Sequence, residues 1–309
     1  MAILTVTPNA AIDRTLLVPG FRTNGVFRET QRDIRAGGKG INVARAVASL
    51  GKQAECCGFL GGWTGKYIAE LAQRDHLPSH WTWIEGESRS CTIIVDSETR
   101  DNTVINERGT PITSQDWERL TEEVRQHVTN KYVCFSGSLP PGSPLDKYNE
   151  LLGYCVENSR CVWVDASGNI LESALKVPGI KAKVNHHEIG TIIGRTIPGP
   201  SYLSSAIPLL RALGLQELVI TFGSRGAAFL TQGEVWFAAS PPVDALCAVG
   251  SGDSFFAGLL VGQASGLPVP DQLKMATAAG AANTLTLGAG FFTLPDYENI
   301  LAQVHVEQL

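Results

Sequence analysis

The sequence lacks the features of a disulfide-stabilised, zinc-binding or membrane-spanning protein. Its seven cysteines are odd in number and form no C-x-x-C pair, so neither a disulfide framework nor a zinc site is predicted. No apolar run approaches the ~20 residues of a membrane helix. The N-terminus has no basic leader, which argues against a signal peptide. We therefore expect a soluble, cytoplasmic protein with reduced thiols and no membrane partner.

Positive charge is also scarce. Twenty-five Lys and Arg stand against thirty Asp and Glu, which gives a net charge of -5. A protein that binds nucleic acid needs an excess of positive charge to neutralise the phosphate backbone. We expect no nucleic-acid partner. Any bound phosphate must instead meet a local cluster of basic groups.

Glycine is abundant, with 32 residues, and strand and helix patterns alternate from residue 115 onward. Predicted strands cover residues 2–7, 132–135, 161–164, 183–185 and 218–222. Predicted helices cover residues 117–128, 145–156, 254–264, 272–287 and 297–304. This alternation predicts a mostly parallel sheet covered on both faces, with ligands at the carboxyl ends of its strands. No linker interrupts the chain, so residues 1–309 are predicted to form one domain.

Four more polar extended segments do not fit that sheet. They cover residues 15–18, 28–35, 91–96 and 103–106. Their mixed polarity predicts a separate small sheet beside the main core.

The stretch around Gly250, Ser251, Gly252 and Asp253 combines small residues with an acid and leads into an apolar run. We predict a helix that starts at about Gly252. The first turn of a helix has unpaired N–H groups and a positive dipole end, which together suit a phosphate. Asp253 is then placed as a base beside a transferred phosphoryl group. The alternative is that Asp253 only caps the helix and the glycines form a turn.

Other glycine-rich segments also need an assignment. Residues 36–42 open a second helix, which Gly51 closes. Residues 61–67 are a near miss to a P-loop, because one residue is missing before Gly65 and Lys66, and Tyr67 replaces the Ser or Thr that binds Mg²⁺. No G-x-G-x-x-G occurs. P-loop and dehydrogenase nucleotide sites are therefore disfavoured.

The two glycine-rich helix starts resemble the two signatures of the ribokinase-like (PfkB) carbohydrate kinases, and the resemblance covers the whole chain. Residues 36–45 and 136–142 resemble the phosphosugar branch, which contains fructose-1-phosphate kinase, tagatose-6-phosphate kinase and the minor 6-phosphofructokinase. The resemblance implies a three-layer α/β/α domain. It also implies a small β-sheet lid, formed by segments within about 12–36 and 88–107, that covers the sugar and often forms a homodimer.

The resemblance also implies a role for individual residues. Asp253 would be the base, and the amides of Gly250, Ser251 and Gly252 would form an anion hole. The residues expected to hold the sugar hydroxyls are Asp13, Gly38 and Asn42, with Ser138 as a further substrate contact. Those expected to meet the phosphate already on the sugar are Arg28, Lys39 and Arg89.

The expected nucleotide site begins with Lys183, Asn185 and Glu188, which match the family pattern K-P-N-x-x-E except that Val184 replaces proline. Asn185 and Glu188 would organise Mg²⁺ and the phosphates through water. The expected contacts to ATP are Thr221, Gly223, Ser224 and Gly226, with Asn283 near the adenine. A requirement for a monovalent cation is left open.

The implied activity is ATP-dependent phosphorylation of a ketohexose phosphate. Residues 106–112 resemble fructose-1-phosphate kinases more than tagatose-6-phosphate kinases, which implies conversion of fructose 1-phosphate to fructose 1,6-bisphosphate. Tagatose-6-phosphate kinase and 6-phosphofructokinase are the alternatives within the branch, and a non-catalytic sugar-phosphate sensor is the alternative outside it. His186 and His187 are adjacent and point about 100° apart on a helix, so they are predicted to face solvent and not to share a metal.

Overall fold

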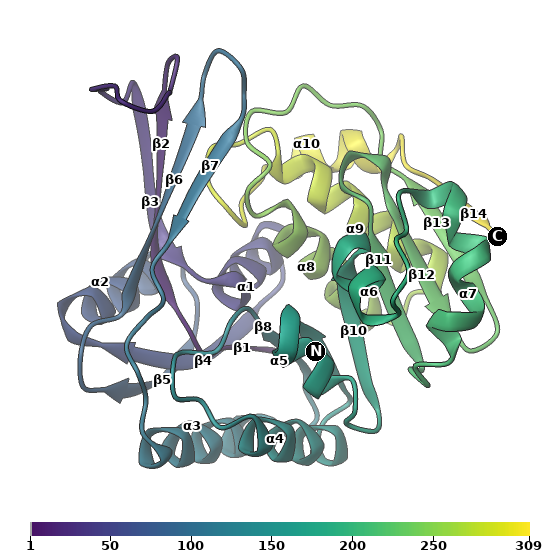
Figure 1. The fold of residues 1–309 in the computed structure, drawn as a ribbon, viewed down its shortest axis with the longest axis horizontal. Helices are drawn as coiled ribbons and strands as arrows, with labels where there is room; N and C mark the ends of the chain where they lie inside the picture. Colours follow the sequence, from purple (N-terminus) through teal and green to yellow (C-terminus); the bar gives the residue numbers. More distant parts are fainter. Residues whose placement is uncertain (1) are drawn as a thin grey trace.

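The structure is a computed structural model that describes residues 2–309. A ten-stranded central sheet divides the molecule (Figure 1). Its strands are β1 (Ile3–Thr7), β4 (Ala54–Gly61), β5 (Ser79–Ile84), β8 (Tyr132–Ser136), β9 (Cys161–Asp165), β10 (Ile180–Asn185), β11 (Glu217–Thr221), β12 (Ala227–Thr231), β13 (Val235–Ala239) and β14 (His305–Gln308). They lie in the order β14-β13-β12-β11-β10-β9-β8-β1-β4-β5. In this spatial order, the strands from β11 to β5 run parallel to one another. β12, β13 and β14 each pair antiparallel with the strand before them.

Helices cover both faces of this sheet, each over its own apolar core. One layer contains α1 (Lys39–Ser49), α2 (Gly62–Arg74), α8 (Ser251–Ala264), α9 (Val269–Asn283) and α10 (Leu294–Leu301). The other contains α3 (Ser114–His127), α4 (Leu145–Asn158), α5 (Gly168–Ala174), α6 (His186–Ile192) and α7 (Leu203–Arg211). The predicted three-layer α/β/α architecture with a mostly parallel sheet is confirmed.

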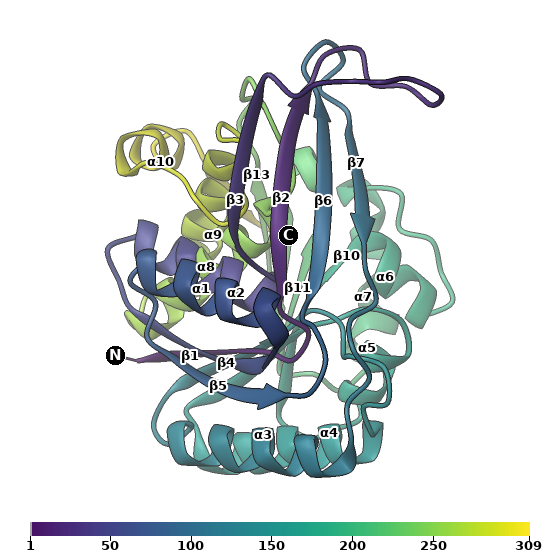
Figure 2. The same ribbon diagram turned by 90° about the vertical axis from the view of Figure 1, so that its left-hand side faces the viewer.

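The predicted small sheet is also confirmed. It consists of β2 (Ala11–Val18), β3 (Gln31–Gly37), β6 (Arg89–Asp96) and β7 (Asn102–Asn106), in the order β3-β2-β6-β7. Figure 2 shows this lid standing away from the central sheet, with its long loops at the far end. β3 begins at Gln31, three residues later than expected, so Arg28 lies in the loop between β2 and β3.

α8 and α9 pack together at glycines. A Cβ on Gly258 would lie 2.8 Å from the Cα of Ala276, and one on Gly280 would lie 3.1 Å from the Cβ of Phe255. Larger residues at these positions would push the helices apart. α8 is buried on nearly every side, between the sheet, α1 and α9. Its N-terminus is therefore held in a fixed position.

The boundaries of the last helices differ from the prediction. The helix predicted at 272–287 spans Val269–Asn283, because the Asn283 side chain accepts a hydrogen bond from Gly290 N–H in the turn that follows. The helix predicted at 297–304 begins at Leu294, with Thr293 as its N-cap, and ends at Leu301. β14 follows, and its short, exposed sequence gave no strand signal. Its pairing with β13 decides its conformation.

Residues 54–84 had no predicted elements, and the structure places β4, α2 and β5 there. The P-loop near miss lies at the junction of β4 and α2. The carboxylate of Glu87 accepts hydrogen bonds from the N–H groups of Trp63 (3.0 Å) and Thr64 (2.9 Å). These are the donors that a phosphate would need, so they are already satisfied. Within residues 2–309, none of the helices has the length and apolar character needed to cross a bilayer.

Candidate functional site

A cavity of about 760 Å³ lies where the lid meets the carboxyl ends of the central strands. The lid, the loop after β8 and the first turns of α1 and α8 form its wall. Many of the predicted site residues line it together: Asp13, Gly38, Lys39, Asn42, Arg89, Ser138, Lys183, Gly250, Gly252 and Asp253. The structure thus brings together side chains that are far apart in the sequence.

The turn before α8 requires glycine. Gly250 has φ of 82°, in the left-handed region, and a Cβ there would lie 2.6 Å from the Cα of Ala289. Among residues 2–309 no backbone acceptor pairs with the N–H of Gly250 or of Gly252. A Cβ on Gly252 would lie only 3.2 Å from Nζ of Lys183. Free amides, a helix N-terminus and an ammonium group therefore converge on one place, which suits an anion.

A hydrogen bond between α1 and α8 orients the Asp253 carboxylate. Asn42 Nδ2 donates to Asp253 Oδ2 at 2.9 Å, and Arg45 Nη1 donates to Asn42 Oδ1 at 3.0 Å. The Arg45 bond fixes which end of the Asn42 amide is the donor. Arg45 is itself paired with Asp75 at 2.6 Å through Nε. The chain Asp75, Arg45, Asn42, Asp253 therefore runs from the end of α2 to the start of α8.

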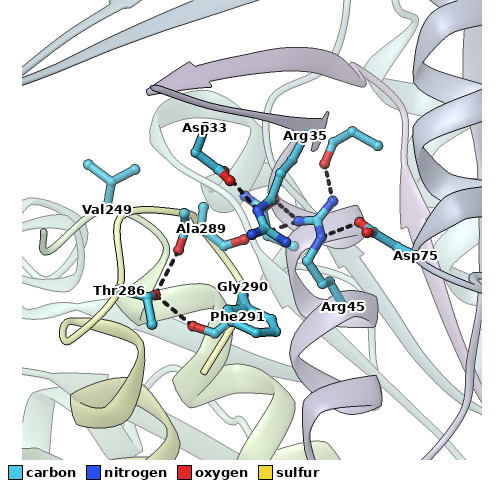
Figure 3. A network of polar contacts seen from close by, with 12 residues as sticks. Asp33, Arg35, Arg45, Asp75, Val249, Thr286, Ala289, Gly290 and Phe291 are labelled. Atoms are coloured by element: carbon cyan, nitrogen blue, oxygen red, sulfur yellow. Dashed lines mark hydrogen bonds and ion pairs between the residues drawn. The ribbon is translucent and has the colours of Figure 1, made fainter. Parts of the chain in front are cut away.

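Arg45 is a residue whose role the sequence analysis missed. It is 3% exposed and also donates to the carbonyls of Ala36, at the end of β3, and of Ala289, at 3.1 Å (Figure 3). One guanidinium thus joins α1, the root of the lid and the loop that packs on Gly250. Its position three residues after Asn42 on a helix places the two on one face, which is the signal that was available.

A second contact joins the lid to the same loop. The Arg35 guanidinium, paired with Asp33, lies over the ring of Phe291 at 4.9 Å from its centroid. Thr286 Oγ1 donates to the Phe291 carbonyl at 2.9 Å and holds the loop closed. β3 is therefore anchored next to the turn that carries Gly250.

Two lysines share one buried carboxylate. Asp165 Oδ1 accepts a hydrogen bond from Lys39 Nζ, and Asp165 Oδ2 accepts one from Lys183 Nζ, each at 2.7 Å. Burial by itself would raise the pKa of Asp165, but the two ammonium groups outweigh it and lower the pKa to about 2. Burial would lower the pKa of Lys39, and the charges of Asp165 and Asp253 instead raise it. Lys39, expected at the phosphate of the sugar, thus lies beside Lys183 near Asp253.

Asp253 is 7% exposed, and its environment disfavours the ionised form. Burial raises its pKa to about 6, although the positive charges of Lys39 and Lys183 and the bond from Asn42 act in the opposite direction. A carboxyl group with a pKa near the working pH can accept a proton during a reaction and release it afterwards.

The lid side of the cavity carries two arginines, Arg89 and Arg108, together with Asp13 and Glu107. Arg89 donates from Nε to the Asn9 carbonyl at 3.0 Å and from Nη1 to the Glu107 carbonyl at 3.3 Å. Asn9 Nδ2 in turn donates to Ser138 Oγ at 3.0 Å. The cavity wall also includes lid residues that the sequence analysis did not select: Asn106, Glu107 and Arg108. They lie at the end of β7 and directly after it, so only the lid fold brings them here.

Two expected residues lie elsewhere. Arg28 is exposed in the loop between β2 and β3 and is outside the cavity wall. Asn283, expected near the adenine, is fully buried. Its side chain accepts from Ser254 Oγ at 2.8 Å and donates to the Val249 carbonyl at 2.9 Å. Asn283 therefore supports the turn before α8 and does not line a cavity.

A second cavity, of about 550 Å³, adjoins the first, and Gly252 lines both. Its wall contains the expected nucleotide residues Thr221, Gly223, Ser224 and Gly226, together with Ser251. Residues on α9 and in the 240–245 loop complete it: Thr277, Gly280, Ala281, Ser240, Pro241, Pro242, Val243 and Ala245. The first turn of α8 therefore lies between the two cavities.

Asn185 and Glu188 form a capping box at the start of α6. Asn185 Oδ1 accepts from the N–H groups of His187 and Glu188, and Glu188 Oε2 accepts from Asn185 N–H at 2.9 Å. These bonds use Asn185 Oδ1 and Glu188 Oε2, so Glu188 Oε1 is the oxygen available for a further contact. Mg²⁺ commonly keeps several waters and uses few protein carboxylates, so Glu188 fits a water-mediated contact.

The raised pKa of Asp253 predicts an effect on stability. Moving the pKa from 3.8 to about 6 makes ionisation in the folded state cost roughly 3 kcal/mol at pH 8. Asp253→Asn keeps an acceptor for Asn42 and removes the charge. Urea unfolding should show the variant more stable than wild type at pH 8 by up to that amount, and by about half as much at pH 5. A variant less stable at pH 8 would contradict this assignment.

Comparison with known proteins identifies the family of the chain. The model of the "pfkB family carbohydrate kinase" matches residues 4–296. The chain is 30% identical over 310 residues to the 1-phosphofructokinase of Bacillus subtilis, and the match covers 99% of this chain and all of the relative.

Solved structures of phosphofructokinase-2 from Escherichia coli are similar, each 26% identical. The complex with substrates and products gives a TM-score of 0.91 and covers 98% of this chain and 99% of that one. The potassium complex gives 0.89 and the tetrameric inhibited form 0.88, each covering 97% of this chain and 98% of the other. The chain therefore belongs to the pfkB family of carbohydrate kinases and is a sugar-phosphate kinase of that family.

Proposed function

We propose that this kinase transfers the γ-phosphoryl group of ATP to the free terminal hydroxyl of fructose 1-phosphate, giving fructose 1,6-bisphosphate and ADP. The observation that carries the proposal is the placement of Asp253. Its buried carboxyl group, with a pKa near 6, lies in the first turn of α8 beside two lysines and faces a cavity whose lid side carries Arg89 and Arg108. The relative named 1-phosphofructokinase supports the choice of substrate.

The chemistry follows from these positions. Asp253 takes the proton of the hydroxyl as its oxygen bonds to the γ-phosphorus, and the bond from that phosphorus to the bridging oxygen of ADP breaks. The amides of the turn before α8 and the ammonium of Lys183 stabilise the negative charge on the transferred group. Mg²⁺ bound with ATP would neutralise phosphate charge, and Glu188 would hold it through water.

ATP is assigned to the second cavity. The loop after β11 and residue Gly226 provide backbone that can approach a nucleotide closely, and the wall on α9 is lined by small residues. The turn shared by both cavities lets the γ-phosphate reach Asp253. A similar phosphofructokinase-2 has been solved in complex with potassium, so a monovalent cation should be added in the assay as one condition to test. The proposal does not require this cation.

Two other phosphosugars remain alternatives. Fructose 6-phosphate and tagatose 6-phosphate also carry a phosphate at one end and a hydroxyl at the other, so the cavity accepts each by the same contacts. A sensor without activity is disfavoured, because Asp253, Lys183 and Glu188 are all present in one arrangement. The test is ADP release, coupled to a reporter enzyme, across a panel of sugar phosphates. The highest kcat/KM with a substrate other than fructose 1-phosphate would overturn the assignment.

The lid is proposed to pair with the lid of a second copy. Val26 is 96% exposed in the loop between β2 and β3, and Ile105 is 57% exposed on the edge strand β7. Apolar side chains on a sheet edge are a common basis for association. Light scattering should give twice the mass of the 33.1 kDa chain. The mass should return to that of one chain in a variant with Val26→Lys and Ile105→Lys. A monomeric wild type would exclude this dimer.

Asp253→Asn should separate binding from chemistry. Loss of a positioned base lowers kcat by roughly 10²–10⁴, with the affinities for ATP and sugar changing by a few-fold at most. In wild type, kcat/KM should fall as the pH drops through about 6, because Asp253 becomes protonated. The phosphate of the substrate titrates in the same range, so the residual rate of the variant is the control. Near-normal turnover in Asp253→Asn would remove the base assignment.

Arg89→Ala tests whether the acceptor carries a phosphate. A hydrogen bond to a charged group contributes about 1.5–3 kcal/mol, so kcat/KM for the phosphosugar should fall roughly ten- to hundredfold. The apparent KM for ATP and the weak activity on unphosphorylated fructose should hardly change.

Arg89 also holds the backbone of Asn9 and Glu107, so its variant needs a structural control. Thermal melting of Arg89→Ala and of Arg89→Lys provides it. Equal losses on both sugars would show that Arg89 supports the lid and does not bind phosphate. A wild type that prefers the neutral sugar would contradict the phosphosugar assignment.

A further inference from the structure

A cluster of histidines and carboxylates lies at the edge of the central sheet opposite the catalytic cavity. Glu55 is near the start of β4 and His80 near the start of β5, whereas the cavity lies at the carboxyl ends of the strands. Glu123 and His127 come from the last turns of α3, four residues apart and therefore on one face of the helix. The four side chains are 25–32% exposed. None of them lines the catalytic or the nucleotide cavity.

The four side chains form a closed set of polar contacts. His80 Nε2 lies 3.0 Å from Glu55 Oε2, and His127 Nε2 lies 3.1 Å from Glu123 Oε1. Their other ring nitrogens cross over: His80 Nδ1 is 3.9 Å from Glu123 Oε1, and His127 Nδ1 is 3.9 Å from Glu55 Oε2. The two rings stack with their centroids 3.5 Å apart. Within residues 2–309, Glu55, His80 and His127 are the one group whose ligand atoms approach closely enough to share a metal ion, and Glu123 contacts both of these rings.

Without a metal, two charge states of the rings, both neutral and both protonated, conflict with these contacts. A neutral imidazole has one donor and one acceptor nitrogen. If each ring donates to its nearer carboxylate, its other nitrogen turns a lone pair toward the second carboxylate. If both rings are protonated, two cations stack at 3.5 Å. A cation between the rings and the carboxylates removes both conflicts.

A lysine orients one of the carboxylates. Lys131 Nζ donates to Glu55 Oε1 at 2.5 Å, so that Glu55 Oε2 is the oxygen that faces His80 Nε2 at 3.0 Å.

We propose that Glu55, His80, Glu123 and His127 bind a divalent transition metal ion of the zinc class. Two imidazoles and two carboxylates are a ligand set for zinc and its neighbours, whereas Mg²⁺ and Ca²⁺ prefer oxygen ligands alone. Glu123, whose Oε1 lies 3.1 Å from His127 Nε2, supplies the fourth ligand. The tetrahedral shell is then filled and leaves no position for substrate, so the site is structural. The ion joins α3 to β4 and β5 at the edge of the sheet.

Binding requires one local movement. The stacked rings are nearly parallel, with 19° between their planes, so their lone pairs do not meet at one point. Rotation of each ring about its Cβ–Cγ bond turns a nitrogen toward the other ring. This torsion is broad and inexpensive in histidine. The partial exposure of both rings leaves room for the rotation.

The experiment uses the full chain without a histidine tag, stripped of metal by a chelator that is then removed. Titration with Co²⁺ should give visible absorption bands of tetrahedral coordination that saturate at one equivalent and are displaced by Zn²⁺. At Zn²⁺ about a hundredfold above its Kd, the melting temperature should rise by about 4–8 °C. Neither signal depends on kinase activity, so the result is independent of the proposed substrate.

Two variants and a matched control decide the outcome. His80→Gln with His127→Gln should abolish both signals. His186→Gln with His187→Gln removes another adjacent histidine pair and should keep both. Glu123→Gln preserves the ring stack and should weaken Zn²⁺ binding at least tenfold. Absence of a saturating Co²⁺ spectrum in wild type, retention of it in the first variant, or unchanged affinity in Glu123→Gln would overturn the proposal.

Discussion

The structure depends on keeping one carboxylate, that of Asp253, buried at the N-terminus of α8. Burial costs free energy for an ionised group unless other charges and hydrogen bonds compensate. The positive end of α8, the ammonium groups of Lys39 and Lys183 and the amide of Asn42 supply that compensation. The compensation is partial, which leaves the pKa of Asp253 near 6 and keeps the group able to exchange a proton.

Much of the surrounding architecture fixes the geometry of this turn. Gly250 has no side chain because the Ala289 loop packs directly on it, and Asn283 holds the carbonyl of Val249. The small residues of α9 let that helix approach α8 closely. The ion pair of Arg45 with the partly exposed Asp75 is weak as a source of stability, but removing Asp75 leaves the buried charge of Arg45 without this partner. Its value here is orientation: it sets the amide of Asn42 that faces Asp253.

The lid is linked to both cavities through polar contacts. Arg89 holds the backbone on either side of the sugar cavity. At the far turn of the lid, Arg100 pairs with Asp244 and donates to the Ala245 carbonyl at 3.2 Å, and Ala245 lines the nucleotide cavity. Exposed ion pairs contribute little free energy. Such a contact can therefore break and form as the lid moves, whereas the buried anchor at Arg45 stays in place.

The sequence alone determined the layers, the lid and the identity of the turn at Gly250, because periodicity and glycine-rich helix starts are local signals. Through resemblance to a family it also supplied ten of the residues that line the first cavity. Only the tertiary structure decided that Asn283 supports the turn before α8 and that Lys39 is paired with Asp165. It also placed Arg28 outside the cavity wall. The tertiary structure was also required to find the strands β5 and β14 and the cluster of Glu55, His80 and His127. These features arise from contacts between residues distant in the chain, and no local pattern of residues records such contacts.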